Sequence, residues 1–179
     1  MSAVDRTTCE PVTADLFEVT ARRGRAKDLA NIARVRGLDL PSVGRASFST
    51  THVVLSVRPD RWLVVAPAKE PGETASQWKR AFGPLASVVD QSSGHAIFDL
   101  TGSTVRDVLS RSCRIDLHAS IFFIGRSAAT VMAQVQTIIV RHPAGFLVLT
   151  PSSTGRHFRE WFLHVAASIA PLSSGESAP

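Results

Sequence analysis

The sequence predicts an α+β fold with mostly antiparallel sheets and helices packed on one face. Short strand-like runs occur in groups around turn signals, and helical patterns return only between these groups. The expected order is strand, helix, hairpin, helix, two strands, helix, three strands and helix. A doubly wound parallel sheet needs a helix after almost every strand, so this order argues against it.

The predicted strands share alternation or a short apolar run bounded by turn residues. They cover residues 16–20, 52–57, 61–66, 87–90, 96–101, 128–135, 137–141 and 146–150. Pro59 and Asp60 predict the turn of a hairpin, because proline fixes φ and aspartate bonds to its own backbone. His142 to Gly145 predicts a second turn, between the last two strands.

The predicted helices share apolar residues at spacings of three and four. The first covers residues 25–35 and ends at Gly37. The second covers residues 74–82, with Thr74 and Gln77 at the spacing of a capping box. A third opens at Gly102. The last begins at Ser152, and its apolar face consists of Phe158, Trp161, Phe162, Val165 and Ile169.

A length of 179 residues is that of one ordinary domain with a real core. Residues 1–14 are expected to form a loose arm, 15–170 the domain and 171–179 a disordered Ser-rich tail. A division into two lobes is expected near Pro84. Residues 41–51, rich in Ser, Thr and Gly, are expected to form a polar loop.

Composition limits the cellular compartments and the binding partners that are expected for this chain. The apolar runs are short of the roughly 20 residues that span a bilayer, and residues 1–11 lack the apolar stretch of a signal peptide. Two distant cysteines form no metal or disulfide framework. The chain is therefore expected to be cytoplasmic, with reduced thiols and no membrane contact.

A net charge of +5 includes a basic cluster between Arg22 and Arg36. Nucleic-acid binding is disfavoured, because no aromatic residues are interleaved with the cluster and the chain has no Tyr. A solvated face, or a face docked on an acidic partner, is the simpler explanation of the charge. Salt-sensitive binding to DNA or RNA would separate the two interpretations.

No residue pattern predicts catalysis. The chain has no glycine fingerprint for a dinucleotide or for phosphates, and Asp116 with His118 lacks a third metal ligand. Residues 90–95 contain Asp, Ser and His, but turn chemistry explains them more simply than a hydrolytic triad. Neighbouring arginines would lower the pKa of Cys113, although a small core residue is the simpler interpretation.

The centre of the chain contains Asp90-Gln91-Ser92-Ser93-Gly94, Ile97-Phe98-Asp99-Leu100-Thr101-Gly102, Val105-Arg106-Asp107-Val108-Leu109 and Cys113-Arg114-Ile115-Asp116-Leu117-His118, and the hairpin before it contains Arg58-Pro59-Asp60-Arg61-Trp62-Leu63. These stretches resemble the sarcosine oxidase gamma subunits, over about residues 16–167. The specific run passes through Arg106, Asp107, Val108, Leu109, Cys113, Asp116, Leu117 and His118, and the hairpin match is weaker. Two departures leave the amine substrate open. Ser103 stands where proline is common in the family, and Gln91 replaces an apolar residue.

The resemblance implies a fold like part of the folate-binding aminomethyltransferase domain. It implies an accessory, non-catalytic subunit, with alpha, beta and delta partners, of an oxidase that demethylates sarcosine to glycine and passes the one-carbon unit to tetrahydrofolate. FAD, FMN and NAD would lie in the partner subunits. The alternatives are a subunit of a related N-methyl amine oxidase or dehydrogenase, and a stand-alone folate-binding one-carbon protein.

The loop over residues 113–126 is the predicted docking surface for a large subunit. It is apolar for a connection and has few turn residues. Interfaces favour arginine and aromatic anchors, and the expected exposed anchors are Arg114, His118, Phe122, Phe123 and Arg126. The open alternative is that Phe122 and Phe123 close the chain's own core.

Overall fold

The computed structural model describes residues 6–68, 70 and 72–169. They form two five-stranded sheets, in which the strand pairings are antiparallel. The N-terminal sheet has the order β3 (Arg45–Phe48), β4 (Val53–Arg58), β5 (Arg61–Pro67), β2 (Ala14–Ala21), β6 (Ala86–Asp90).

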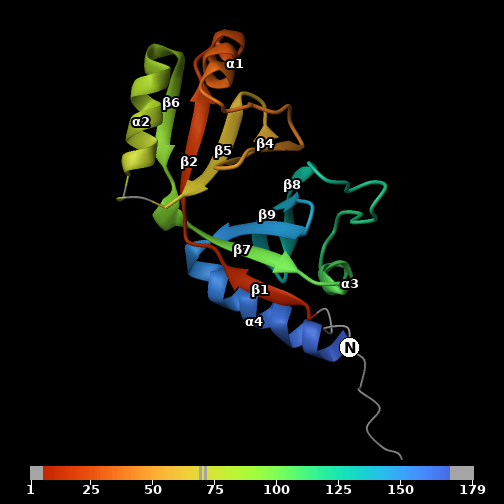
Figure 1. The fold of residues 1–179 in the computed structure, drawn as a ribbon. Helices are drawn as coiled ribbons and strands as arrows, with labels where there is room; N and C mark the ends of the chain where they lie inside the picture. Colours follow the sequence, from red (N-terminus) through yellow and green to blue (C-terminus); the bar gives the residue numbers. More distant parts are fainter. Residues whose placement is uncertain (1–5, 69, 71, 170–179) are drawn as a thin grey trace, which may run out of the picture.

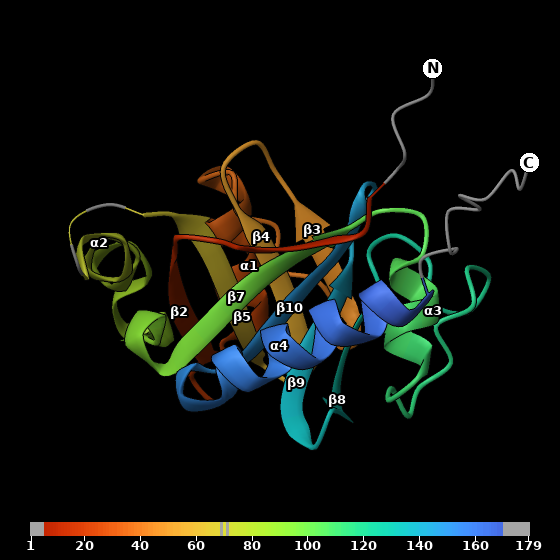
Figure 2. The ribbon, with the colours of Figure 1, turned by 90° about the horizontal axis from the view of Figure 1, so that it is seen from below.

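The C-terminal sheet has the order β1 (Thr8–Pro11), β7 (His95–Thr101), β10 (Gly145–Pro151), β9 (Val135–Arg141), β8 (Ser127–Met132). The helices are α1 (Ala26–Val35), α2 (Glu73–Phe82), α3 (Val105–Ser110) and α4 (Ser152–Ile169). Helices α1 and α2 cover the outer face of the N-terminal sheet, and α4 crosses the outer face of the C-terminal sheet (Figures 1 and 2). The predicted α+β class, with helices on one face of each sheet, is confirmed.

Three hydrophobic cores hold these layers together. One lies under α3 and α4 and contains Phe158 and Phe162 of the last helix. A second lies under α1 and α2 and contains Leu29 and Phe82. The third, which we call the shared core, contains residues of both sheets, such as Leu63 of β5. Strands β5 and β10 are buried on both faces, which explains their unbroken apolar runs.

The expectation of a loose arm is wrong for Thr8–Pro11. This segment is strand β1, which pairs with β7 from Thr8↔Thr101 to Pro11↔Phe98 and buries Cys9. Four residues ending in proline carry too little alternation to be recognised as a strand. Residues 1–5 and the predicted disordered tail at 171–179 lie outside the described residues.

The predicted polar loop at 41–51 is wrong for Arg45–Phe48, which forms edge strand β3. The predicted capping box at the start of α2 is also wrong. Thr74 lies inside the helix, and its buried hydroxyl donates to Asp15 Oδ2 at 2.6 Å, while the Gln77 side chain donates to Glu73. A tertiary contact with β2 therefore takes the hydroxyl that the local pattern assigned to the helix end.

Strands β6 and β7 are consecutive but belong to different sheets. The connection between them, Ser92–Gly94, is a short 3-10 turn. The chain passes from the N-terminal to the C-terminal sheet here, later than the division expected near Pro84. Ser92 anchors the passage, because its hydroxyl accepts from Leu16 N at 2.9 Å and donates to Leu16 O at 3.2 Å.

Candidate functional site

The loop predicted as the docking surface connects α3 to β8 without regular structure. Its two phenylalanines have opposite environments. Phe122 is 3% exposed, stacks on Phe146 at 6.3 Å between ring centroids and belongs to the core under α3 and α4. The prediction that Phe122 is an exposed anchor is therefore wrong, since this residue closes the chain's own core. Phe123 is 42% exposed.

Arg114 and His118 are exposed, as expected. The His118 backbone N–H donates to Asp116 Oδ1, and its Nδ1 lies 2.8 Å from Ser120 Oγ. The Asp116–His118 pair thus makes local turn bonds. The described part of the chain contains no group of three His, Cys, Asp or Glu side chains arranged for a metal ion.

Phe123 is the centre of an exposed apolar patch with cationic neighbours. Ile121 and Ile124 are each 52% exposed beside it. The guanidinium carbon of Arg45 lies 4.6 Å from the Phe123 ring centroid, and that of Arg126 lies 5.8 Å from it. Planar guanidinium groups over an aromatic face are typical anchors of protein interfaces. The sequence had indicated Phe123 and Arg126 but had missed Arg45, and Arg126 is half-buried rather than exposed as expected.

The end of the loop is fixed to both sheets. Arg126 forms a β-bridge with Arg45 of β3, and its carbonyl accepts from the Arg141 N–H of β9 at 2.9 Å. The Gly125 N–H donates to Arg141 O at 2.9 Å. These backbone bonds hold the exposed patch in place, although it belongs to a loop.

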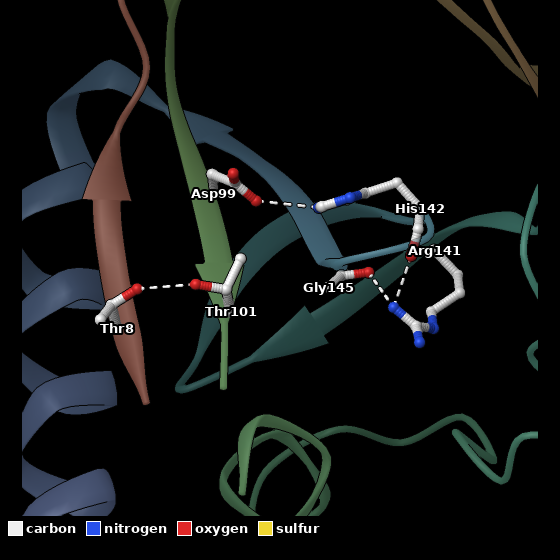
Figure 3. A network of polar contacts seen from close by, with 6 residues as sticks. All are labelled: Thr8, Asp99, Thr101, Arg141, His142 and Gly145. Carbon is white, nitrogen blue, oxygen red and sulfur yellow. Dashed lines mark hydrogen bonds and ion pairs between the residues drawn. The ribbon is translucent and has the colours of Figure 1, made fainter. Parts of the chain in front are cut away.

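A second arginine pair lies over Phe146. The guanidinium carbons of Arg141 and Arg106 lie 4.9 Å and 5.4 Å from its ring centroid. Figure 3 shows the Arg141 side chain folded back over its own turn, where it donates to the carbonyls of His142 and Gly145. Burial, and next the charge of Arg106, lower the pKa of Arg141.

The same view shows how the β9–β10 turn is tied to β7. His142 Nε2 lies 2.8 Å from Asp99 Oδ1 (Figure 3). Further along β7, the hydroxyl groups of Thr101 and Thr8 lie 3.0 Å apart. The His142–Asp99 contact fixes the backbone next to Arg141 against β7, and the Thr8–Thr101 contact holds β1 against β7.

Asp90, Ser92 and His95, whose residue types occur in hydrolytic triads, have structural roles. Asp90 Oδ1 accepts from the Ser92 backbone N–H, and Ser92 holds Leu16. His95 Nδ1 lies 3.4 Å from Gln91 O rather than against a serine hydroxyl. The turn interpretation explains the segment.

The cysteine thiols are unfavourable nucleophiles. Desolvation by burial raises the pKa of Cys113 above its usual value, which contradicts the alternative of a thiol activated by neighbouring arginines. Burial also raises the pKa of Cys9 to about 12. Both residues pack in the core under α3 and α4, as small hydrophobic residues do.

A cleft of about 540 Å³ opens between the two sheets at the margin of the shared core. Two charged residues that line the cleft partly neutralise each other, because Arg61 Nη1 lies 3.7 Å from Glu18 Oε1. Its aromatic residue, Trp62, is 7% exposed, and its indole N–H donates to Pro41 O. Because Trp62 is buried, its indole ring offers no face on which a flavin or pteridine ring would stack.

Comparison with known proteins shows the family. The model of the "Sarcosine oxidase, gamma subunit family" matches residues 23–167. The chain belongs to the sarcosine oxidase gamma subunit family. The gamma subunit from Corynebacterium sp. (strain P-1) is 28% identical over 145 residues, which is 79% of this chain and 70% of that protein. The gamma subunit from Arthrobacter sp. is 32% identical over 115 residues, or 63% and 56% of the two chains.

Solved structures show the same fold. A chain of heterotetrameric sarcosine oxidase from Corynebacterium sp. U-96 superposes with a TM-score of 0.81, at 24% identity and over 98% of this chain and 90% of that one. Glycine cleavage system aminomethyltransferase T from Bartonella henselae gives 0.65 at 16% identity, over 89% of this chain and 46% of that one. The gamma subunit family therefore has the fold of part of an aminomethyltransferase, as the resemblance implied.

The described helices include none with the length and hydropathy needed to cross a bilayer.

Proposed function

We propose that this chain is the accessory, non-catalytic gamma subunit of a heterotetrameric flavin-dependent oxidase that demethylates sarcosine to glycine. The match of the gamma subunit family to residues 23–167 carries the proposal. In it, alpha, beta and delta subunits complete a cytoplasmic assembly. FAD, FMN, NAD and tetrahydrofolate bind to those partners, and the one-carbon unit passes to tetrahydrofolate.

The role of this chain in the assembly is to present a docking surface. The exposed Phe123 between two guanidinium groups supports this assignment, together with Ile121 and Ile124 beside it. Arg114, His118 and Arg126 complete the proposed contact. Phe122 instead supports the surface from beneath, through the core.

Purification of the native protein with its partners tests the function. We expect the gamma chain to co-purify with three further subunits, identified by mass, in a complex that has a flavin absorbance band and oxidises sarcosine. The gamma chain purified alone is expected to be colourless. A monomeric native protein, or a flavin band in the isolated folded chain, would contradict the proposal.

The docking surface has a separate test. Changing Arg114 and Arg126 together to glutamate is expected to abolish co-purification, because it places repulsive charges in the contact. The matched control changes Arg58 of β4 and Arg80 of α2, which are exposed and lie outside the loop, to glutamate. If both double variants co-purify at full stoichiometry, the docking surface lies elsewhere. Circular dichroism of each isolated variant shows whether folding is preserved.

A further inference from the structure

Arginines lie opposite one another across three neighbouring backbone segments. Arg45 bridges Arg126, and Arg126 lies opposite Arg141, whose N–H it accepts at 2.9 Å. Opposed residues of antiparallel segments project to the same face, where like charges destabilise the pairing. Arg106 of α3 adds a fourth cation, since it shares the Phe146 ring with Arg141. We call these four residues the arginine ladder.

The ladder lacks a compensating charge in residues 6–68, 70 and 72–169. The ion pairs there involve other arginines, namely Arg25, Arg61 and Arg156, and the nearby Asp99 is engaged by His142. Each ladder residue is half-buried, so water screens the repulsion only in part. Two pairs of cations, one on Phe123 and one on Phe146, without a carboxylate are an unfavourable arrangement for an isolated chain.

Two donors of the ladder are also without hydrogen-bond partners in this part of the chain. Arg106 Nη1 and Arg126 Nε are buried nitrogens with no acceptor. A buried donor normally has a partner, because desolvation without a hydrogen bond is costly. An anionic oxygen from outside the described residues would both balance the positive charge and accept hydrogen bonds from the unpaired donors.

We propose that the arginine ladder receives carboxylate side chains of a partner subunit in the oxidase. This inference rests on the proposed function and adds the chemistry of the partner surface, which is acidic with apolar residues beside the acids. The guanidinium fork matches a carboxylate with two parallel hydrogen bonds, and stacking on Phe123 and Phe146 fixes the forks before binding. A free anion would leave Ile121 and Ile124 uncovered, whereas a protein surface covers both.

The test changes Arg45 and Arg106 together to glutamine. Arg45 and Arg106 are chosen because they lie at the two ends of the ladder. Arg126 and Arg141 lie at its centre, and the Arg141 side chain also holds its own turn through bonds to two carbonyl groups. Binding of the full-length chain to the remaining co-purified subunits is measured at low and high salt. We expect the dissociation constant to rise at least about tenfold at low salt, and the salt dependence to weaken, because charge-assisted bonds are lost.

Three comparisons make the result specific. The Arg58 and Arg80 double change to glutamine keeps the net charge equal to that of the test variant, and we expect it to change the dissociation constant less than about twofold, as for exposed solvated charges. Changing Arg45 and Arg106 to lysine should recover part of the affinity, since charge returns without the fork. The isolated glutamine variant should melt at the same or a higher temperature than the isolated lysine variant, because both lose the guanidinium stacking and only the glutamine variant relieves the repulsion.

Each opposite result overturns the inference. An unchanged dissociation constant in the glutamine variant shows that the partner does not use the ladder. If the isolated glutamine variant melts below the isolated lysine variant, the positive charge is stabilising and the carboxylate comes from this chain. If phosphate or acetate raises the melting temperature of the parent but not of the variant, the ladder is a site for free anions. If the parent chain binds no partner subunits, the proposed function and this inference fail together.

Discussion

Phe122 and Phe123 are adjacent in the chain and yet serve different purposes. The first is 3% exposed and stacked on Phe146, whereas the second is 42% exposed beneath Arg45 and Arg126. A loop without regular structure allows consecutive side chains to point in opposite directions. A single residue step therefore separates core stability from surface recognition.

Truncating these two residues one at a time should separate the two effects. Phe122→Ala is expected to lower the free energy of unfolding by about 3–5 kcal/mol, because it leaves a cavity in the core. Phe123→Ala should cost at most about 1 kcal/mol, the scale of exposed cation–π contacts, but should weaken assembly. Urea unfolding of the isolated variants measures the first effect and co-purification the second. Equal destabilisation by both would contradict the assignment.

Variants at Ser93 and His118 test the proposal that this chain supplies no catalytic residue. In the assembled complex, Ser93→Ala and His118→Ala are each expected to keep most of kcat for sarcosine. A direct acid, base or nucleophile contributes about 10²-fold or more, on the order of 3 kcal/mol. A loss of that size in either variant, with assembly intact by gel filtration, would show that the chain takes part in the chemistry.

Helix α4 lies unusually close to the C-terminal sheet at Gly155. A Cβ atom built there would stand 2.6 Å from Ala96 Cβ on β7, a distance at which one of the two elements must shift. The same helix carries Phe158 and Phe162 into the core. The close approach therefore determines how deeply the whole helix packs.

Gly155→Ala is expected to destabilise the protein in spite of its better helix propensity. Propensity favours alanine by about 1 kcal/mol, but overpacking costs about 1–3 kcal/mol, so we expect a net loss of up to about 2 kcal/mol. Adding Ala96→Gly removes the opposing methyl group and should restore much of the stability. Thermal unfolding of the two single variants and the double variant measures this coupling. Additive losses would contradict the contact.

Elements with strong local periodicity could be predicted from the sequence. The β4–β5 hairpin and helix α4 were predicted near their observed positions, because turn chemistry and apolar spacing are local signals. Strand β1 and strand β3 were missed, since four residues gain their strand conformation from a partner far along the chain. The Thr74 hydroxyl was assigned to the wrong partner, because Asp15, to which it donates, is distant in sequence.

The candidate interface could likewise be predicted only in part. An apolar loop with arginines at its ends indicated residues 113–126, but composition does not reveal that Phe122 turns inward. The arginine ladder was not predictable at all. Arg45, Arg126 and Arg141 are scattered in the sequence, and only the register between β3, the loop and β9 aligns them.

At the scale of the whole molecule, burial of Cys9 links stability to alkaline pH. Desolvation raises its pKa in the folded chain to about 12 from a usual value of 9.0. The folded state therefore holds this proton more tightly than the unfolded state. The resulting contribution is fully present below pH 9 and is lost as the pH rises toward 12, at about 1.4 kcal/mol per pH unit.

The melting temperature is accordingly expected to fall as the pH is raised above 9. The chain contains no Tyr, which removes one other group that titrates in this range. Cys9→Ala should show a smaller fall over the same interval, although it starts from a lower stability because of the lost packing. Parallel pH curves for the two proteins would show that the thiol does not carry the effect.

Strand β1 is synthesised before the strand and the helix with which it packs. Its partners, Thr101 of β7 and the Arg159 side chain that donates to Cys9 O at 3.2 Å, come from the second half of the chain. On the ribosome, the β1 segment therefore stays exposed to water until β7 and α4 have emerged. During this interval Cys9 is an accessible thiol, and closure then hides it. Ribosome-stalled chains that end before residue 150 should react with maleimide at Cys9, and full-length released chains should resist it; equal labelling of both would contradict this order of events.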